Sequence, residues 1–135
     1  MKKKGSFTIE AAIVVPFLLL IMLLLIHISF FLYNREAATV IASRAVLKGV
    51  QMEQEGKADI KNEIASFLEE ETSAHLIFTQ SVRWDVSVTL TKVKVKLYLI
   101  QDMPFKKLSC EIAEEMNRLN PVSVLWEKER FQKAK

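Results

Sequence analysis

The feature that most constrains this chain is a run from Ala11 to Asn34 without a single charged residue. Most of its residues are Ile, Leu, Val or Phe. As an α-helix rising about 1.5 Å per residue, the run would measure about 36 Å, longer than the roughly 30 Å hydrocarbon core of a bilayer. We therefore expect one membrane-spanning helix, with its span at about residues 11–33.

The charges that flank this run predict its orientation. Lys2, Lys3 and Lys4 precede it, whereas Arg35 and Glu36 follow it together. Because basic residues gather on the cytoplasmic side of membrane helices, we expect the amino terminus in the cytoplasm and the carboxyl-terminal part outside. An ordinary cleaved secretory signal fits less well, because its apolar region is usually about 7–15 residues long and ends in small residues. Here the run is longer and ends in the bulky sequence SFFLY.

Charge and composition argue against nucleic acid, metal and cofactor partners. The formal net charge is +3, which the three lysines at 2–4 supply, so the rest of the chain is neutral and has no long-range field to attract phosphate. Cys110 is the only cysteine, which excludes an internal disulfide and a cysteine-rich metal site. The sequence contains no glycine-rich phosphate loop and no histidine cluster, and His75 is the only histidine after the run. We therefore expect no cofactor and no enzymatic activity.

Three residues near the start are unexpected in a plain membrane anchor. Gly5 separates the lysines from the apolar run, Glu10 is the only acid before Glu36, and Pro16 falls inside the predicted helix. A carboxylate that enters a bilayer unpaired is costly, so such an acid is a candidate functional residue. Proline removes a backbone hydrogen bond and usually bends a helix.

The segment GSFTIEAAIVVPFLLL, from Gly5 onward, resembles the start of TadE-like minor pseudopilins of tight-adherence pili, which are related to type IV pilins and carry a class III signal. The resemblance covers about residues 4–25. It implies that a prepilin peptidase cuts between Gly5 and Ser6, so that residues 1–5 are a cytoplasmic leader. Glu10 then becomes the fifth residue of the mature chain, where the family carries its glutamate. The implied partners are the lipid bilayer, the prepilin peptidase, other pilin subunits and a membrane assembly platform.

One residue departs from the pattern of the major filament subunits. Those subunits are very short and follow the glutamate with tyrosine, whereas this sequence has Ala11. The resemblance therefore favours a minor subunit of a tight-adherence pilus or a related secretion filament. The length excludes a TadG-like protein but leaves a TadF-like subunit open. The alternative from another class is an unprocessed single-pass membrane protein whose outer domain binds a ligand or partner.

Glu10 has a physical role that agrees with this resemblance. Cleavage would create an ammonium group at Ser6, also at the membrane edge. In a filament the Glu10 carboxylate of one subunit could neutralise the Ser6 amine of its neighbour, and loss of one partner would leave a buried charge uncompensated. The simpler interpretation is that Glu10 lies among the lipid headgroups and reaches water.

Helical periodicity continues beyond the membrane run. Small and apolar residues recur at three- and four-residue spacing and predict a helix to about Glu53, half in lipid and half outside as a stalk: Ala38, Ile41, Ala42, Ala45 and Val46. This stripe could pack on the chain's own sheet or on another subunit. After a break at residues 54–57, a second helix is expected to bury Ile60, Ile64, Phe67 and Leu68.

From about His75 the pattern changes to the two-residue period of strands. The apolar set switches from even to odd numbers across Thr91-Lys92, which predicts a hairpin pairing Leu90 with Val93, or one bulged strand. Residues 76–82 are expected to add a third strand, and Asp102-Met103-Pro104 to end the sheet. The lysines at 92, 94 and 96 are expected on its solvated face, with an edge protected by charge as a further option. Residues 112–119 suggest a short helix.

The predicted fold class is therefore α+β. A long amino-terminal helix, over residues 6–54, packs its outer half on a small antiparallel sheet with short helices. Residues 55–135 form the small extracytoplasmic domain.

Overall fold

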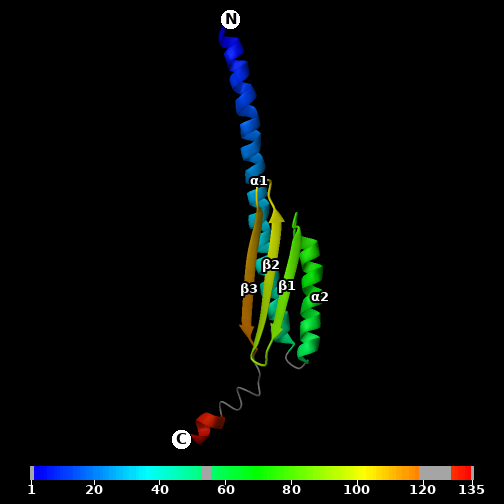
Figure 1. Cartoon of the computed structure of the whole chain (residues 1–135). Coiled ribbons are helices and arrows are strands. Elements are labelled where there is room, and N and C mark those ends of the chain that lie inside the picture. Colours follow the sequence, from blue (N-terminus) through cyan, green and yellow to red (C-terminus); the bar gives the residue numbers. More distant parts are fainter. Residues whose placement is uncertain (1, 53–55, 119–128, 135) are drawn as a thin grey trace.

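The computed structural model describes residues 2–52, 56–118 and 129–134. Two helices are followed by three strands: α1 (Lys2–Gln51), α2 (Lys57–His75), β1 (Ser81–Val88), β2 (Lys92–Asp102) and β3 (Lys107–Asn117). The amino-terminal half of α1 projects alone beyond the rest, and its other half lies against the sheet (Figure 1). This arrangement confirms the predicted α+β fold and its single-pass layout.

The carboxyl-terminal half of α1 packs into the core with a stripe of small residues. All five predicted members of this stripe are buried, at 2% exposure or less: Ala38, Ile41, Ala42, Ala45 and Val46. Because alanine adds almost no side-chain volume, the helix can approach its neighbours closely. It contacts α2, β2 and β3. The stripe therefore packs on the chain's own sheet and second helix, which was the first of the two options.

Gly49 allows α1 to lie close to α2 and β2. A Cβ at this position would lie 2.6 Å from Ile64 Cδ1 and 3.1 Å from Val93 Cγ1. On α2, Ile64 is fully buried together with Ile60 and Leu68, and Phe67 is half-buried against this core. The predicted apolar face of the second helix is therefore confirmed. The break before it includes residues 54–55, which lie outside the described residues, as does the predicted helix end at Glu53.

The predicted hairpin exists, but its turn lies one residue earlier, which shifts the strand register by two residues. β1 and β2 are antiparallel and pair Val88 with Val93, not Leu90 with Val93. The turn is Leu90-Thr91, and the Thr89 backbone N–H donates to the carbonyl oxygen of Lys92 at 2.8 Å. The Lys92 backbone N–H in turn donates to Thr89 Oγ1 at 3.1 Å. Val86 and Val88 still lie on the same face as Val93 and Val95, because this change of register keeps even residues opposite odd ones. Leu90 instead lies in the turn and is 66% exposed.

The third strand was placed wrongly from the sequence. It is β3, over the segment where a short helix was predicted, and it pairs antiparallel with β2 to give the order β1-β2-β3. Asp102-Met103-Pro104 begins a hairpin instead of ending the sheet, and the Met103 backbone N–H donates to the Lys106 carbonyl oxygen at 3.0 Å. Residues 76–80 are a connection, and β1 begins only at Ser81.

Both errors have the same physical reason: backbone hydrogen bonds to distant segments outweighed the local periodicity of the sequence. Leu108, Cys110 and Ile112 alternate along β3, with Ile112 buried and the other two half-buried. Pairing with all of β2 satisfies the backbone of this segment, which a single helical turn could not do as fully. In the 76–80 connection, Ile77 instead bonds to a side chain of α1, and Phe78 has a left-handed φ of 54°.

The lysine row lies on the open face of the sheet, as predicted, but not at an edge. β2 is the central strand. Lys92 and Lys94 lie 3.6 and 3.8 Å from the carboxylate of Glu115, and Lys96 lies 3.7 Å from that of Glu111. Both helices cover the opposite face. The open face is therefore solvated and charged, and its lysines pair with acids of β3.

Candidate functional site

The candidate processing and assembly residues all lie on the projecting part of α1. Lys2, Lys3 and Lys4 form its first turn, followed by Gly5 and Ser6. Lys4, Gly5, Ser6, Glu10 and Pro16 are exposed. Helical geometry puts Glu10 about 7.5 Å along the axis from Gly5, and Pro16 about 9 Å further. These residues share one solvent-exposed helix, and no other element of the described chain covers them.

Gly5 contrasts with Gly49 in its surroundings. A Cβ added at Gly5 would meet no atom within 4 Å, whereas one at Gly49 would clash with Ile64. The backbone at Gly5 is helical, and its φ is not in the left-handed region. Glycine lowers helix stability by about 1 kcal/mol relative to alanine, so this position weakens the helix without any gain in packing within the chain. Gly5 therefore has no structural role inside a single copy.

Glu10 has no charged partner among the described residues. None of the ion pairs in that part of the chain includes its carboxylate. Six residues later, Pro16 lacks the N–H that the Ala12 carbonyl would accept, although α1 continues through it. The Glu10 carboxylate and the Ala12 carbonyl oxygen are thus both available to groups outside the chain.

The other polar side chains of this region bond within their own helix. Thr8 Oγ1 donates to the Lys4 carbonyl at 2.9 Å, and Ser29 Oγ donates to that of Leu25 at 2.8 Å. His27 Nδ1 lies 2.8 Å from the Leu23 carbonyl oxygen. Such bonds reduce the cost of polar groups in an apolar environment. Glu10 differs from these three because its charge stays uncompensated.

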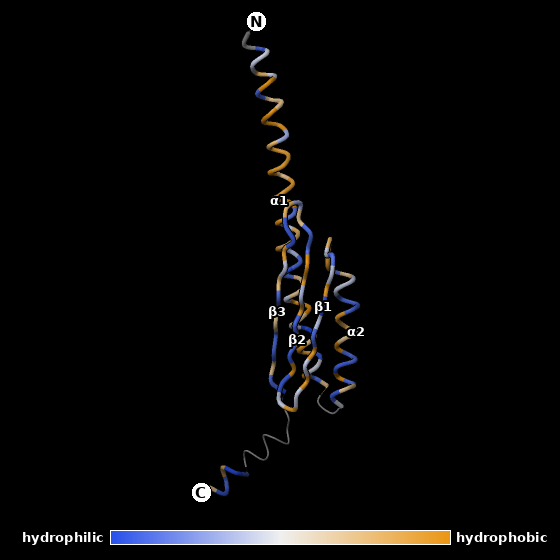
Figure 2. The backbone as a smooth tube through the Cα atoms, in the orientation of Figure 1, coloured by the Kyte–Doolittle hydropathy of each residue, from blue (hydrophilic) through white to orange (hydrophobic). Residues whose placement is uncertain are grey.

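Hydropathy divides α1 into two parts (Figure 2). After its hydrophilic first turns, its projecting part is almost continuously apolar, whereas the sheet and α2 mix apolar and polar residues. The helix Lys4–Gln51 is the one helix among the described residues that is long and apolar enough to cross a membrane, and its most apolar 18-residue window is 0% buried within the chain. The core helix of a soluble protein would be mostly buried, so that explanation does not apply.

Asn34 joins the two parts of α1, and the sequence did not single it out. It is 2% exposed. Its Nδ2 donates to the Ile77 carbonyl at 2.5 Å and to Gln101 Oε1 at 3.1 Å, and its Oδ1 accepts from the Ile77 backbone N–H at 3.0 Å. One side chain thus ties the α2–β1 connection and the end of β2 to the helix where the uncharged run stops. The sequence feature that could have pointed to Asn34 is that this polar residue ends a long apolar run.

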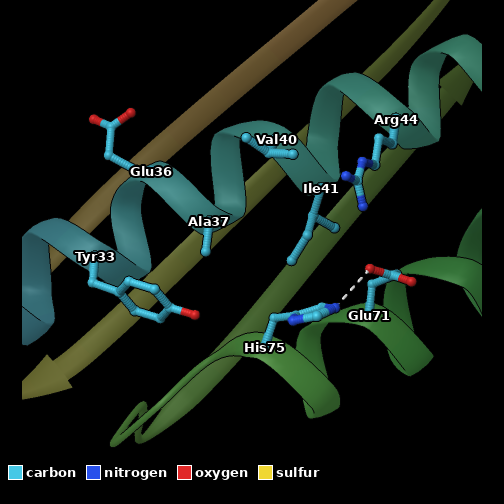
Figure 3. A pocket seen from close by; sticks show the side chains of 8 residues that line it. All are labelled: Tyr33, Glu36, Ala37, Val40, Ile41, Arg44, Glu71 and His75. Carbon is cyan, nitrogen blue, oxygen red and sulfur yellow. Dashed lines mark ion pairs between the residues drawn. The ribbon is translucent and has the colours of Figure 1, made fainter.

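A groove of about 320 Å³ between α1 and α2 is a second candidate site. Its floor is apolar and its rim is charged, and its lining residues are drawn in Figure 3: Tyr33, Glu36, Ala37, Val40, Ile41, Arg44, Glu71 and His75. His75 Nε2 lies 3.3 Å from Glu71 Oε2. A histidine with a single acid is too small a set for a metal, and the described residues contain no group of three or more potential metal ligands. The groove is therefore better suited to binding an apolar side chain than to holding a metal or catalysing a reaction.

These features first define a class of protein. An α+β domain on one exposed apolar helix fits a single-pass membrane protein. The comparison with protein families then gives a particular similarity: the model of the family described as TadE-like protein matches residues 5–47, all of which lie in α1. The match begins at Gly5 and ends at Leu47, directly after the last residue of the buried stripe of α1. No curated protein and no solved structure matches the chain.

Proposed function

We propose that this protein is a minor pseudopilin, a structural subunit that helps assemble a tight-adherence pilus or a related secretion filament, and that it is not an enzyme. The observation that carries the proposal is the TadE-like match over residues 5–47. This segment contains the whole set of candidate processing and assembly residues, Gly5, Ser6, Glu10 and Pro16. The helix also runs without a break into the folded domain, which a removable secretory signal would not do.

In this proposal the chain is inserted with its first residues in the cytoplasm, and a prepilin peptidase cuts after Gly5. The peptidase needs access to the backbone, and the open surroundings of Gly5 provide it in this chain. After cleavage the Ser6 amine and the Glu10 carboxylate lie about 6 Å apart along the helix axis. The unpaired Glu10 carboxylate is then available to the amine of a neighbouring subunit at a membrane assembly platform.

The first test is cleavage by the prepilin peptidase of the native host. Co-expression should remove residues 1–5, as measured by intact mass, and Gly5→Leu should prevent it. Gly49 cannot serve as the control because its substitution disturbs the core, so Ala12→Leu, on the same exposed surface, should be used. An uncut chain in the native host would contradict the pseudopilin assignment.

The second test separates insertion from assembly. Glu10→Ala should leave membrane insertion unchanged but lower the amount of this subunit that enters the filament, because the neighbouring amine loses its partner. Glu36→Ala, an exposed acid on the same helix beyond the uncharged run, is the matched control. Equal filament incorporation of both variants would support the simpler interpretation, in which Glu10 only lies among the lipid headgroups.

The alternative function is an unprocessed single-pass membrane protein whose outer domain binds a partner. The groove between α1 and α2 favours it, because the apolar side chain of Val40 lines the groove and remains 49% exposed. Val40→Asp should then abolish partner binding without affecting cleavage at Gly5. Under the pseudopilin proposal, the same variant is expected to leave cleavage intact and to act, if at all, on subunit packing.

A further inference from the structure

The end of the folded domain that faces the projecting helix carries exposed apolar side chains. This end is formed by residues 77–78, between α2 and β1, and by residues 103–107, which are the loop after β2 and the first residue of β3. We call them together the membrane-proximal rim. Phe78 is 75% exposed and Phe105 is 73% exposed. Lys106 and Lys107 are exposed beside Phe105. Aromatic and lysine side chains together are the composition found at the interface between lipid and water.

The rim lies against α1 inside the uncharged run. The rings of Phe78 and Phe30 are in edge contact, with centroids 5.2 Å apart. A cavity of about 410 Å³ is lined jointly by Ile26, His27, Phe30, Phe78, Gln101 and Asp102. The domain therefore begins at about the level of His27, several residues before the run ends at Asn34.

Asp102 limits how deep this end of the domain can go. Its side chain is 51% exposed and lies 3.7 Å from Lys107 Nζ. A carboxylate in the hydrocarbon core costs about 2.5–3.5 kcal/mol or more, so Asp102 must stay at or outside the headgroup boundary. That boundary therefore lies on the amino-terminal side of His27. Counting back the roughly 20 residues that a hydrocarbon core requires places the other boundary near Phe7.

We propose that the membrane-proximal rim rests in the outer headgroup layer of the bilayer and sets the depth of α1. The hydrocarbon span is then about residues 7–26 and not 11–33. The backbone of Glu10 lies about 5 Å inside the inner hydrocarbon boundary, close enough for its carboxylate to reach the headgroup layer. This inference rests on the proposed membrane placement. The φ of 54° at Phe78 agrees with it, because a non-glycine residue in that region is held there by its surroundings while its ring remains exposed.

The depth of α1 is measurable with spin labels on the full chain. Cys110 is the only cysteine, so a Cys110→Ser background accepts single cysteines, and the protein is reconstituted in vesicles of phosphatidylcholine and phosphatidylglycerol. Ala12→Cys and Leu32→Cys are compared by their accessibility to oxygen relative to a water-soluble nickel chelate. For a span of 7–26, Ala12 lies about 7 Å from the bilayer centre and Leu32 about 23 Å. For a span of 11–33, both lie about 15 Å from it.

The expected result is a several-fold higher oxygen-to-nickel ratio at Ala12→Cys than at Leu32→Cys. A label at Phe105→Cys should give an interfacial ratio, well above that of Leu90→Cys. Leu90 is the matched control, an exposed apolar residue at the opposite end of the sheet, 66% exposed. Phe105 is preferred to Phe78 because Phe78 has both a ring contact and the left-handed backbone.

Two results would overturn the inference, and they differ in what else they contradict. Equal ratios at Ala12 and Leu32, with Phe105 as accessible to nickel as Leu90, would show a domain that stands clear of the bilayer. The membrane placement itself would survive if Leu19→Cys remained inaccessible to nickel. If Leu19→Cys were also accessible, the proposed membrane placement would fail together with the rim.

Discussion

The two halves of α1 belong to one continuous helix but use their apolar residues in opposite ways. Before Asn34 the large apolar side chains are exposed, among them Leu19 at 61% and Leu25 at 58%. After Asn34 the buried residues are small, and Ala38, Ala42 and Ala45 have no exposed surface. None of the described residues before Asn34 is therefore fully buried within the chain, whereas the second half builds the core.

This difference separates apolar residues that stabilise the fold from those that need an external environment. Burial of apolar surface contributes about 25 cal/mol per Å², but only where water is removed. The second half gains this free energy from its own sheet, and the first half must gain it from lipid or from other subunits. Substitutions in the two halves should consequently act on different measurements.

The largest difference is expected between Ile64→Ala and Leu19→Ala. Ile64 is fully buried beneath the second half of α1, and its truncation should lower the free energy of unfolding by about 2–5 kcal/mol. Leu19→Ala should change it by less than about 0.5 kcal/mol, because this residue packs on nothing in the chain. Urea unfolding of the full chain in micelles measures both, with Trp84 fluorescence in a Trp126→Phe background. Similar losses would mean that the projecting half takes part in the fold.

Asn34→Ala should have the next largest effect. It removes three hydrogen bonds and leaves Gln101 and the Ile77 backbone unsatisfied at a buried site, which costs about 1–3 kcal/mol. Ser29→Ala is the control, because Ser29 bonds only to the Leu25 carbonyl of its own helix. The same urea titration applies. If Asn34→Ala unfolded at the same urea concentration as Ser29→Ala, the junction would not be stabilised by this side chain.

The two glycines provide a smaller and sharper comparison. Gly49→Ala overpacks the contact with Ile64 and Val93, at about 1–3 kcal/mol, of which about 1 kcal/mol is offset by the better helix propensity of alanine. Gly5→Ala has no such contact and should leave the unfolding free energy of the domain unchanged. Thermal unfolding followed by circular dichroism distinguishes them. A stabilised Gly49→Ala variant would show that the α1–α2 contact relaxes at no cost.

The smallest effect is expected on the open face of the sheet. Glu115→Gln removes the partner of Lys92 and Lys94, whose groups are about half exposed, and should cost less than about 1 kcal/mol at low salt. The loss should shrink as salt is added, since exposed charges are screened. Glu70→Gln, on the solvated side of α2, is the control. A loss that persists in high salt would point to a packing role instead.

Much of this architecture was predictable because its patterns are local. The uncharged run, the small-residue stripe and the apolar face of α2 each follow from spacing along one helix. The buried faces of β1 and β2 were predicted correctly although the position of the turn was not. Only the alternation of side chains along each strand decides which face is buried. The candidate residues Gly5, Glu10 and Pro16 were recognisable for the same reason, since their meaning lies in their order along one segment.

The errors arose where distant segments compete for the same backbone. Residues 112–119 have an apolar spacing that fits a helical turn, yet β2 offered a partner strand along the whole of β3. Residues 76–80 were predicted as a strand, yet Asn34, 43 residues earlier, binds the Ile77 backbone. No local pattern contains information about such long-range partners, which tertiary packing decides.

By itself, the sequence determined that this chain has an apolar helix fit for a membrane, an acid and a glycine at its start, and an α+β domain behind it. Charge and hydropathy along one helix are sufficient for that, since they do not depend on what lies nearby in space. Only the tertiary structure decided where the domain meets the helix. It placed Phe78 against Phe30 and brought Asp102 and His27 to the lining of one cavity. In our proposal this arrangement moves the membrane boundary toward the amino terminus, because a charge carried by a distant strand limits how far the helix can enter lipid.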